Sequence, residues 1–200
     1  FLAVVCREWE DAAAGAAELG VRLATIRIGI VLAPHEGALA IMTPLFKLGP
    51  GMPIGSGDGF LGRGRQWMSW VHLDDIVGLF DFALMNPQVS GPLNGTAPSP
   101  VRNADFARTF SNRLWKPYAP WRFYLPVGPP DVLLRLVLGE VAQAITSGQR
   151  VIPKRPLDLG YRFIFPEIGP ALDDVLNGKP DTAPTVTSLA RQPSEATHIR

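Results

Sequence analysis

The chain has 200 residues, 46% of them hydrophobic, and a formal net charge of +1. This length is enough to bury the core of one domain or slightly more, and the balanced charge excludes the basic footprint expected of a protein that binds nucleic acid or an anionic membrane. Cys6 is the lone cysteine, which excludes an internal disulfide. No apolar run is long enough to predict a transmembrane helix.

The first predicted elements are a helix and a buried strand. Residues 1–20 repeat apolar side chains every three or four positions, which predicts a helix that ends at Gly20. Residues 21–34 are β-branched and nearly all apolar, which predicts a strand covered on both faces, as in a parallel sheet. Arg22 is expected in solvent. Arg27 is expected in a buried ion pair, with a role as cofactor ligand as the alternative.

A helix and a glycine-rich loop follow. Residues 37–49 predict a helix that Pro44 kinks or interrupts. Residues 49–64 are too rich in glycine for a regular element and predict a loop. This loop lacks the Gly-Lys-Ser/Thr ending of a phosphate-binding P-loop, and it follows a helix instead of a strand, which argues against phosphate binding.

Strands and helices alternate after the loop. The expected elements are a strand over 66–73, a helix over 74–86, a strand over 91–98 and a helix over 102–114. We expect Asp74 or Asp75 to cap the first of these helices and Asn103 the second. The alternation predicts βαβ units.

From residue 117 prolines become dense, which predicts a second lobe over 117–177. Short helices are expected there over 129–145, 154–160 and 165–176, with a small strand over 161–165. Residues 178–200 are polar, lack periodicity and predict a disordered tail.

The stretch RQWMSWVHLDD, residues 65–75, carries the densest group of functional side chains. Trp67 and Trp70 are an odd number of residues apart on a strand, so they are expected on opposite faces, one in the core and one beside a cleft. His72 is expected to be a wall residue, with substrate contact as the alternative. No metal site is expected, because three scattered histidines and one cysteine form no ligand cluster.

Residues 21–34, 65–84 and 91–107 together resemble the latter half of extended short-chain dehydrogenases/reductases. The most similar group is the atypical, sugar-nucleotide-epimerase-like family, some of whose members are labelled cell-division inhibitors. Residues 138–172 are similar to the C-terminal domain of unknown function of that group. The resemblance implies an α/β fold, in which residues 1–116 form the C-terminal part of a Rossmann-like parallel sheet and 117–177 a smaller, mostly helical substrate lobe.

The same resemblance implies NADP as cofactor, with the nicotinamide lying against the backbone of Ile28, Gly29 and Ile30. Gly29 would let the ring approach, and the alternative is that it only relieves packing. The family's Gly-rich dinucleotide turn is absent, and the chain begins as if inside a helix. We therefore expect a fragment that does not bind NADP tightly by itself.

The family's catalytic pair is a Tyr followed four residues later by a Lys. If Glu10 matches the family's acidic residue two turns after the Tyr, Leu2 and Cys6 occupy the two catalytic positions, and the catalytic residues are unknown. Leu2 has no proton to exchange, and Cys6 is expected in the core.

The family's diphosphate-binding arginine falls on Met68. Arg65 lies about 10 Å away along a strand, which makes it an imperfect replacement. The predicted substrate-binding residues are Arg65, Gln66, Trp67 and His72.

Two functions remain open at this point. One is an NAD(P)-dependent oxidoreductase or epimerase-like protein acting on an unknown small molecule, with a nucleotide sugar less favoured. The other is a catalytically silent NADP-binding regulator or scaffold, linked to division of cells or organelles. The expected location is the cytoplasm, or an organelle interior if a transit peptide lies upstream, and the oligomeric state is open.

Overall fold

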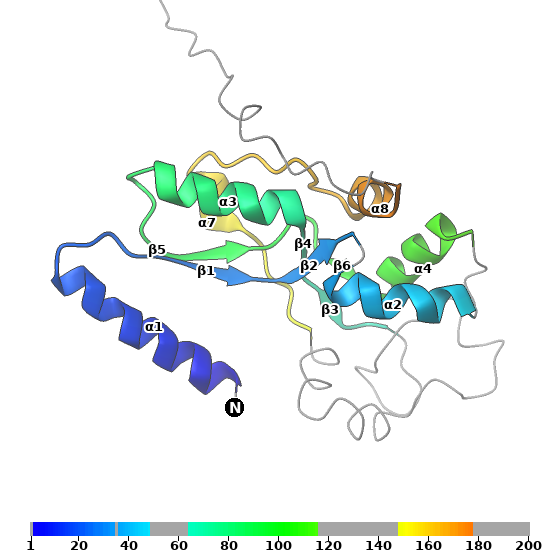
Figure 1. The fold of residues 1–200 in the computed structure, drawn as a ribbon, viewed down its shortest axis with the longest axis horizontal. Coiled ribbons are helices and arrows are strands. Elements are labelled where there is room, and N and C mark those ends of the chain that lie inside the picture. Colours follow the sequence, from blue (N-terminus) through cyan, green and yellow to red (C-terminus); the bar gives the residue numbers. More distant parts are fainter. Residues whose placement is uncertain (1, 35, 49–63, 116–147, 178–200) are drawn as a thin grey trace, which may run out of the picture.

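The computed structural model describes residues 2–34, 36–48, 64–115 and 148–177 (Figure 1). Its elements in chain order are α1 (Leu2–Glu18), β1 (Ala24–Ile28), β2 (Ile30–Ala33), α2 (Gly37–Leu48), β3 (Trp67–Met68), β4 (Trp70–His72), α3 (Leu73–Met85), β5 (Gly91–Gly95), β6 (Val101–Arg102), α4 (Asn103–Arg113), α7 (Lys154–Asp158) and α8 (Ile168–Asn177). None of the helices in these ranges is long and apolar enough to span a membrane.

The segment predicted as one strand over 21–34 forms two strands, β1 and β2, which are separated by Gly29. β1 pairs in parallel with β5, and β2 pairs in parallel with β4. β3 and β6 form a short antiparallel pair. The predicted parallel pairing and mixed α/β class are therefore confirmed, and Gly29 lies where one strand passes from the first pair to the second.

Two apolar cores hold these elements together. The larger core joins β2, β4, α2, α4 and α8 and includes the fully buried rings of Trp70, Phe106 and Phe110. The smaller core packs α3 on β1 and β5 through Ile76, Leu79 and other apolar side chains. Because α8 packs against α4 and β2, the C-terminal segment belongs to the same packed body as the strands. The predicted boundary at 117 falls outside the described residues and stays a prediction.

Two expectations about β1 need correction. The strand is only partly covered within the described residues, and the side chain of Ile28 is 50% exposed. Arg27 does form an ion pair, with Glu10 at 2.6 Å, but its side chain is 57% exposed, so the pair lies at the surface. Arg22 is exposed as predicted, and its guanidinium also donates to the carbonyls of Ala83, Leu84 and Val89 at the end of α3.

The predicted helix caps are wrong. His72 caps α3, since its Nδ1 accepts the backbone N–H of Asp74 at 3.1 Å. Arg102 takes the N-cap position of α4, and Asn103 is the first helical residue. The helix predicted over 37–49 forms as α2, Gly37–Leu48, and Pro44 does not interrupt it.

The predicted strand over 161–165 does not form, because the amides of Ile164 and Phe165 donate to a carboxylate instead of to a neighbouring strand. The short helices α7 and α8 confirm two of the predicted C-terminal helices. Residues 49–63, the predicted helix over 129–145 and the predicted tail lie outside the described residues.

Candidate functional site

A pocket of about 580 Å³ opens at the carboxyl ends of β1 and β5. Its lining comes from residues 27–29, Ser69, Asn94, Thr96, residues 149–152 and Lys154. In open α/β sheets, ligands bind outside the carboxyl ends of the parallel strands, where the chain reverses its direction along the sheet. The pocket therefore occupies the position at which such a fold binds its ligand.

Gly29 forms the tightest point of the pocket wall. Its N–H donates to the carbonyl of Gly95 at 3.0 Å, which joins β1 to β5 at the level of the pocket. A Cβ at this position would lie 2.5 Å from the carbonyl oxygen of Ser69 and 2.9 Å from Cγ2 of Thr96. Even alanine does not fit without a shift of the backbone, so Gly29 has a packing role whatever else it does.

A strap, residues 149–152, crosses the strand ends and forms one side of the pocket. The hydroxyl of Ser69 donates to the carbonyl of Gln149 at 2.7 Å and accepts the N–H of Val151 at 2.9 Å. Asn94 donates to the carbonyl of Ile152 at 3.1 Å, and Thr96 to that of Val151 at 3.5 Å. Short polar side chains at the strand ends therefore hold the strap by its backbone and leave its side chains available to the pocket.

The charges on the pocket wall are all positive. Arg27, Arg150 and Lys154 line it, and no acidic residue does so among the described residues. Glu10 engages Arg27 through two hydrogen bonds of 2.7 and 2.6 Å, and the bond from Arg27 lowers the pKa of Glu10. Arg27 is thus neutralised at the rim, whereas Arg150 and Lys154 have no carboxylate partner in the described part of the chain.

One tryptophan of the RQWMSWVHLDD stretch lies in the core, as predicted, and the other does not line the pocket. Trp70 is fully buried, and its indole N–H donates to the carbonyl of Ser99 at 3.1 Å. Trp67 is half-buried, with the guanidinium of Arg102 at 3.9 Å and that of Arg150 at 5.3 Å from its ring centroid. Trp67 therefore links the RQWMSWVHLDD stretch to the strap, although it is not itself part of the pocket lining.

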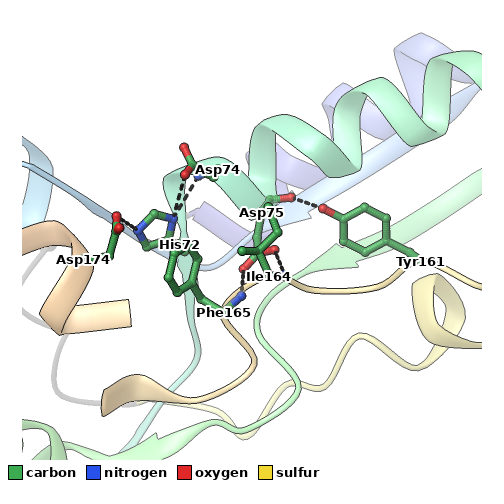
Figure 2. A network of polar contacts seen from close by, with 7 residues as sticks. All are labelled: His72, Asp74, Asp75, Tyr161, Ile164, Phe165 and Asp174. Atoms are coloured by element: carbon green, nitrogen blue, oxygen red, sulfur yellow. Dashed lines mark hydrogen bonds and ion pairs between the residues drawn. The ribbon is translucent and has the colours of Figure 1, made fainter. Parts of the chain in front are cut away.

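Asp75, the second aspartate of this stretch, anchors the C-terminal segment (Figure 2). The carboxylate of Asp75 is fully buried; its Oδ1 accepts the N–H of Ile164 at 2.6 Å and its Oδ2 that of Phe165 at 3.0 Å. The carbonyl of Asp75 accepts the hydroxyl of Tyr161 at 2.7 Å. Asp75 therefore ties α3 to residues 161–165 and has a structural role.

Tyr161 does not supply the missing catalytic tyrosine. Burial, with a smaller contribution from the Asp75 carboxylate, raises the pKa of its phenol well above the ordinary value. Its hydroxyl already donates to Asp75 and lies where a Cβ on Gly78 would meet it, at 2.7 Å. The phenol therefore stays protonated, and it is not part of the pocket lining.

The fold also brings together His72, Asp74 and Asp174, whose possible ligand atoms lie within 4.8 Å of one another. Nδ1 of His72 accepts the N–H of Asp74, so the neutral ring carries its proton on Nε2. That nitrogen faces Oδ2 of Asp174 at 3.3 Å. An imidazole in this tautomer has no free lone pair for a metal. The three residues are better explained as a helix cap, His72, with the Asp174 carboxylate beside its Nε2.

The structure places some of the predicted site residues in the pocket lining and others outside it. Ile28 and Gly29 line the pocket, and Ile30 lies just beyond it, paired with Trp70. Arg65, Gln66, Trp67 and His72 are outside the described lining. Gln66 and His72 are buried, whereas Arg65 is exposed and its carbonyl accepts a hydrogen bond from Arg102.

Sequence reasoning missed Ser69, Asn94, Thr96 and the strap. Asn94 and Thr96 are polar residues at the carboxyl end of a predicted parallel strand, and this is a signal that a ligand site lies there. Ser69 interrupts an apolar run between two tryptophans, which is also an unusual place for a hydroxyl.

The opening helix gives a mixed result. The Glu10–Arg27 ion pair joins α1 to β1, and the placement of Leu2 and Cys6 at the family's catalytic positions stays a prediction. However, the expectation that Cys6 packs in the core is wrong, because its side chain is exposed.

We expect Ser69→Ala to loosen the strap. The variant loses two hydrogen bonds to backbone, which should cost about 1–2 kcal/mol of unfolding free energy. Hydrogen–deuterium exchange should show faster exchange in peptides that contain Val151. Ser90→Ala, at an exposed position, is the control and should leave both quantities unchanged. Unchanged exchange at Val151 in the Ser69 variant would contradict the role of this hydroxyl.

Comparison with known proteins shows clear relatives. Residues 129–175 match a family described as Domain of unknown function (DUF1731). The epimerase family protein SDR39U1 homolog, chloroplastic, of Arabidopsis thaliana is 43% identical over 176 residues, which is 88% of this chain and 46% of that protein. The mouse epimerase family protein SDR39U1 is 38% identical over 177 residues, or 88% of this chain and 55% of that protein. The chain therefore spans about half the length of these curated relatives.

Solved structures agree with these matches. The crystal structure of human epimerase family protein SDR39U1 (isoform 2) with NADPH is 36% identical, with a TM-score of 0.67, and the match covers 80% of this chain and 50% of that chain. A nucleoside-diphosphate sugar epimerase from Corynebacterium glutamicum is 31% identical, with a TM-score of 0.63 over 88% of this chain and 31% of that chain.

Proposed function

Since the chain belongs to the atypical, epimerase-like family of extended short-chain dehydrogenases/reductases, we propose that it forms the C-terminal part of an NADP-binding protein. In this proposal the nicotinamide end of the cofactor enters the pocket beside Gly29. The remaining part of the relatives' length supplies the adenosine end of the site.

The observation that carries the proposal is the close-packed glycine at the carboxyl ends of two parallel strands, facing a pocket of about 580 Å³. Ligand pockets typically have volumes of roughly 300–1,000 Å³, so this one has room for the nicotinamide and for a small second molecule. Further support comes from the human relative, which was solved with NADPH. The backbone of Ile28, Gly29 and Ile30 is the proposed contact surface for the ring.

The dinucleotide needs more than these residues offer. Its pyrophosphate is bound at the N-terminus of a helix that follows a Gly-rich turn, where free N–H groups and the helix dipole meet the negative charge. In the described part of the chain, no strand is followed by such a turn. Residues 1–200 by themselves are therefore expected to show no saturable NADPH binding in calorimetry, whereas the full-length protein binds it.

We expect NADPH to protect the pocket in the full-length protein. In hydrogen–deuterium exchange, peptides covering residues 27–30 and the strap should exchange more slowly with NADPH bound. Adenosine 2′,5′-bisphosphate is the matched control ligand, because it keeps the adenosine end of the cofactor and lacks the nicotinamide. It should leave both peptides unchanged. Equal protection by the two ligands, or none by NADPH, would contradict the proposed placement.

The proposed reaction classes are oxidation–reduction and epimerisation. A nucleotide sugar is the less favoured substrate, because Met68 occupies the position of the family's diphosphate-binding arginine and is buried in the larger core. Substrate contacts by Arg65, Gln66, Trp67 and His72 stay predictions.

A second candidate, a catalytically silent NADP-binding regulator or scaffold, follows from the sequence of the opening helix. If Glu10 matches the family's acidic residue, Leu2 and Cys6 stand in place of the Tyr and Lys. Turnover of NADPH by the full-length protein, across a panel of carbonyl compounds and sugar nucleotides, separates the two candidates. The name of the Arabidopsis relative, chloroplastic, supports an organelle as one proposed location.

A further inference from the structure

We propose that the second ligand of this pocket, the molecule that lies beside the nicotinamide, carries a carboxylate or phosphate group that Arg150 and Lys154 bind together. This inference rests on the proposed NADP site and adds the chemical class of the other ligand. Neither residue is among the positions that the family resemblance pointed to.

The charges on the pocket wall carry the inference. Of its three cationic side chains, Arg27 is held by Glu10 at 2.6 Å and its charge is balanced. Arg150 and Lys154 have no such partner among the described residues, and no acidic side chain of that part of the chain lines the pocket. Two uncompensated positive charges around one cavity favour an anionic ligand, because field lines focus in a concave, partly apolar wall.

Hydrogen bonds hold the backbone on both sides of Arg150. Ser69 binds the carbonyl of Gln149 and the N–H of Val151, the two peptide groups that flank Arg150. The guanidinium lies 5.3 Å from the ring of Trp67, within the range of a cation–π contact. The backbone at Arg150 is thus fixed, and the guanidinium, beside the Trp67 ring, has no carboxylate partner among the described residues.

The pair also has suitable chemistry. A guanidinium presents parallel N–H groups that match two oxygens of a carboxylate or phosphate, and an ammonium adds a compact charge without a fixed direction. Lys154, the first residue of α7, lies two residues after the strap, so both cations come from one short segment of the chain. An oxyanion bound there lies at the same opening as the proposed nicotinamide surface at Gly29.

The test uses the full-length protein saturated with NADPH and calorimetric titration with three probes. Malonate and inorganic phosphate represent the two oxyanion sources, and malonamide matches malonate in size without its charge. We expect binding of malonate, phosphate or both, and none of malonamide. The probe that binds more tightly shows whether the ligand's anionic group is a carboxylate or a phosphate.

Arg150→Gln and Lys154→Gln should each weaken oxyanion binding by about tenfold, while NADPH affinity stays within about twofold of wild type. Arg162→Gln is the matched control, because it removes the same charge from an exposed position outside the pocket lining, and it should change neither affinity.

The outcomes separate this inference from the proposed function. Loss of NADPH affinity in the Arg150 or Lys154 variants would assign these residues to the cofactor and overturn the inference, while the NADP site would stand. Absence of oxyanion binding, or equal binding by wild type and variants, would also overturn it. Failure of the wild-type protein to bind NADPH would instead refute the proposed function on which the inference rests.

Discussion

Replacing Asp75 by alanine is expected to lower the free energy of unfolding by about 2–5 kcal/mol, since two partly buried backbone N–H groups lose their acceptor. The carboxylate is fully buried and accepts the N–H groups of Ile164 and Phe165, 89 and 90 residues further along the chain. No other described element pairs with that segment as a strand, so within the described residues this side chain is the acceptor for these two amides. Urea denaturation of the full-length protein measures the effect.

Two further variants make the result specific. Asp75→Asn keeps one acceptor oxygen and turns an NH₂ group toward the other donor, so its loss of stability should be smaller than that of alanine and still well above zero. Asp74→Asn is the control, because its side chain is 42% exposed. A stability of Asp75→Ala within about 0.5 kcal/mol of wild type would show that residues 161–165 are held by other contacts.

The pH dependence of stability offers a second readout of Asp75. Burial raises the pKa of its carboxyl above the ordinary 3.8, and the two N–H groups that it accepts offset only part of that rise. Between 3.8 and the raised value the native state binds more protons than the unfolded state. The stability that this pKa difference contributes is therefore fully present below the ordinary pKa. It is lost as the pH rises through the pKa of Asp75 in the folded state. Asp75→Asn should abolish that component.

Trp70→Ala is expected to destabilise the protein by about 3–5 kcal/mol through the cavity that it leaves in the larger core. The indole is fully buried, in the same core as Phe106 and Phe110, and its N–H donates to Ser99. This core joins β2 and β4 to α4 and α8, so the whole C-terminal helix depends on it. The measurement is again the urea denaturation midpoint of the full-length protein.

Trp70→Phe separates the cavity from the lost hydrogen bond. Phenylalanine fills most of the space, so its cost should be clearly smaller than that of alanine, about 1–2 kcal/mol. Trp9→Ala is the control, because Trp9 is 72% exposed on α1 and its removal leaves no cavity in either core. Equal effects at Trp9 and Trp70 would mean that the larger core is not assembled around Trp70.

The sequence by itself determined which segments are helices and strands in most of the described chain. Apolar spacing predicted α1, α3 and α4, the β-branched run predicted β1 and β2, and the alternation of these elements predicted a parallel sheet. Helices and strands depend mainly on neighbours within a few positions. An apolar repeat of three to four residues therefore indicates a helix, and a repeat of two residues indicates a strand. The same local patterns carried the family resemblance.

Only the tertiary structure decided what the polar residues do. The sequence predicts Asp74 or Asp75 as a helix cap, but the cap is His72, and Asp75 accepts amides from a distant segment. Ser69 binds the backbone on both sides of Arg150, although 80 residues separate Ser69 from the carbonyl to which it donates. A hydroxyl or carboxylate has the same local pattern whether it faces water or a partner. The choice is made by the packing of whole elements, which brings remote donors and acceptors within bonding distance, and no local repeat in the sequence encodes that.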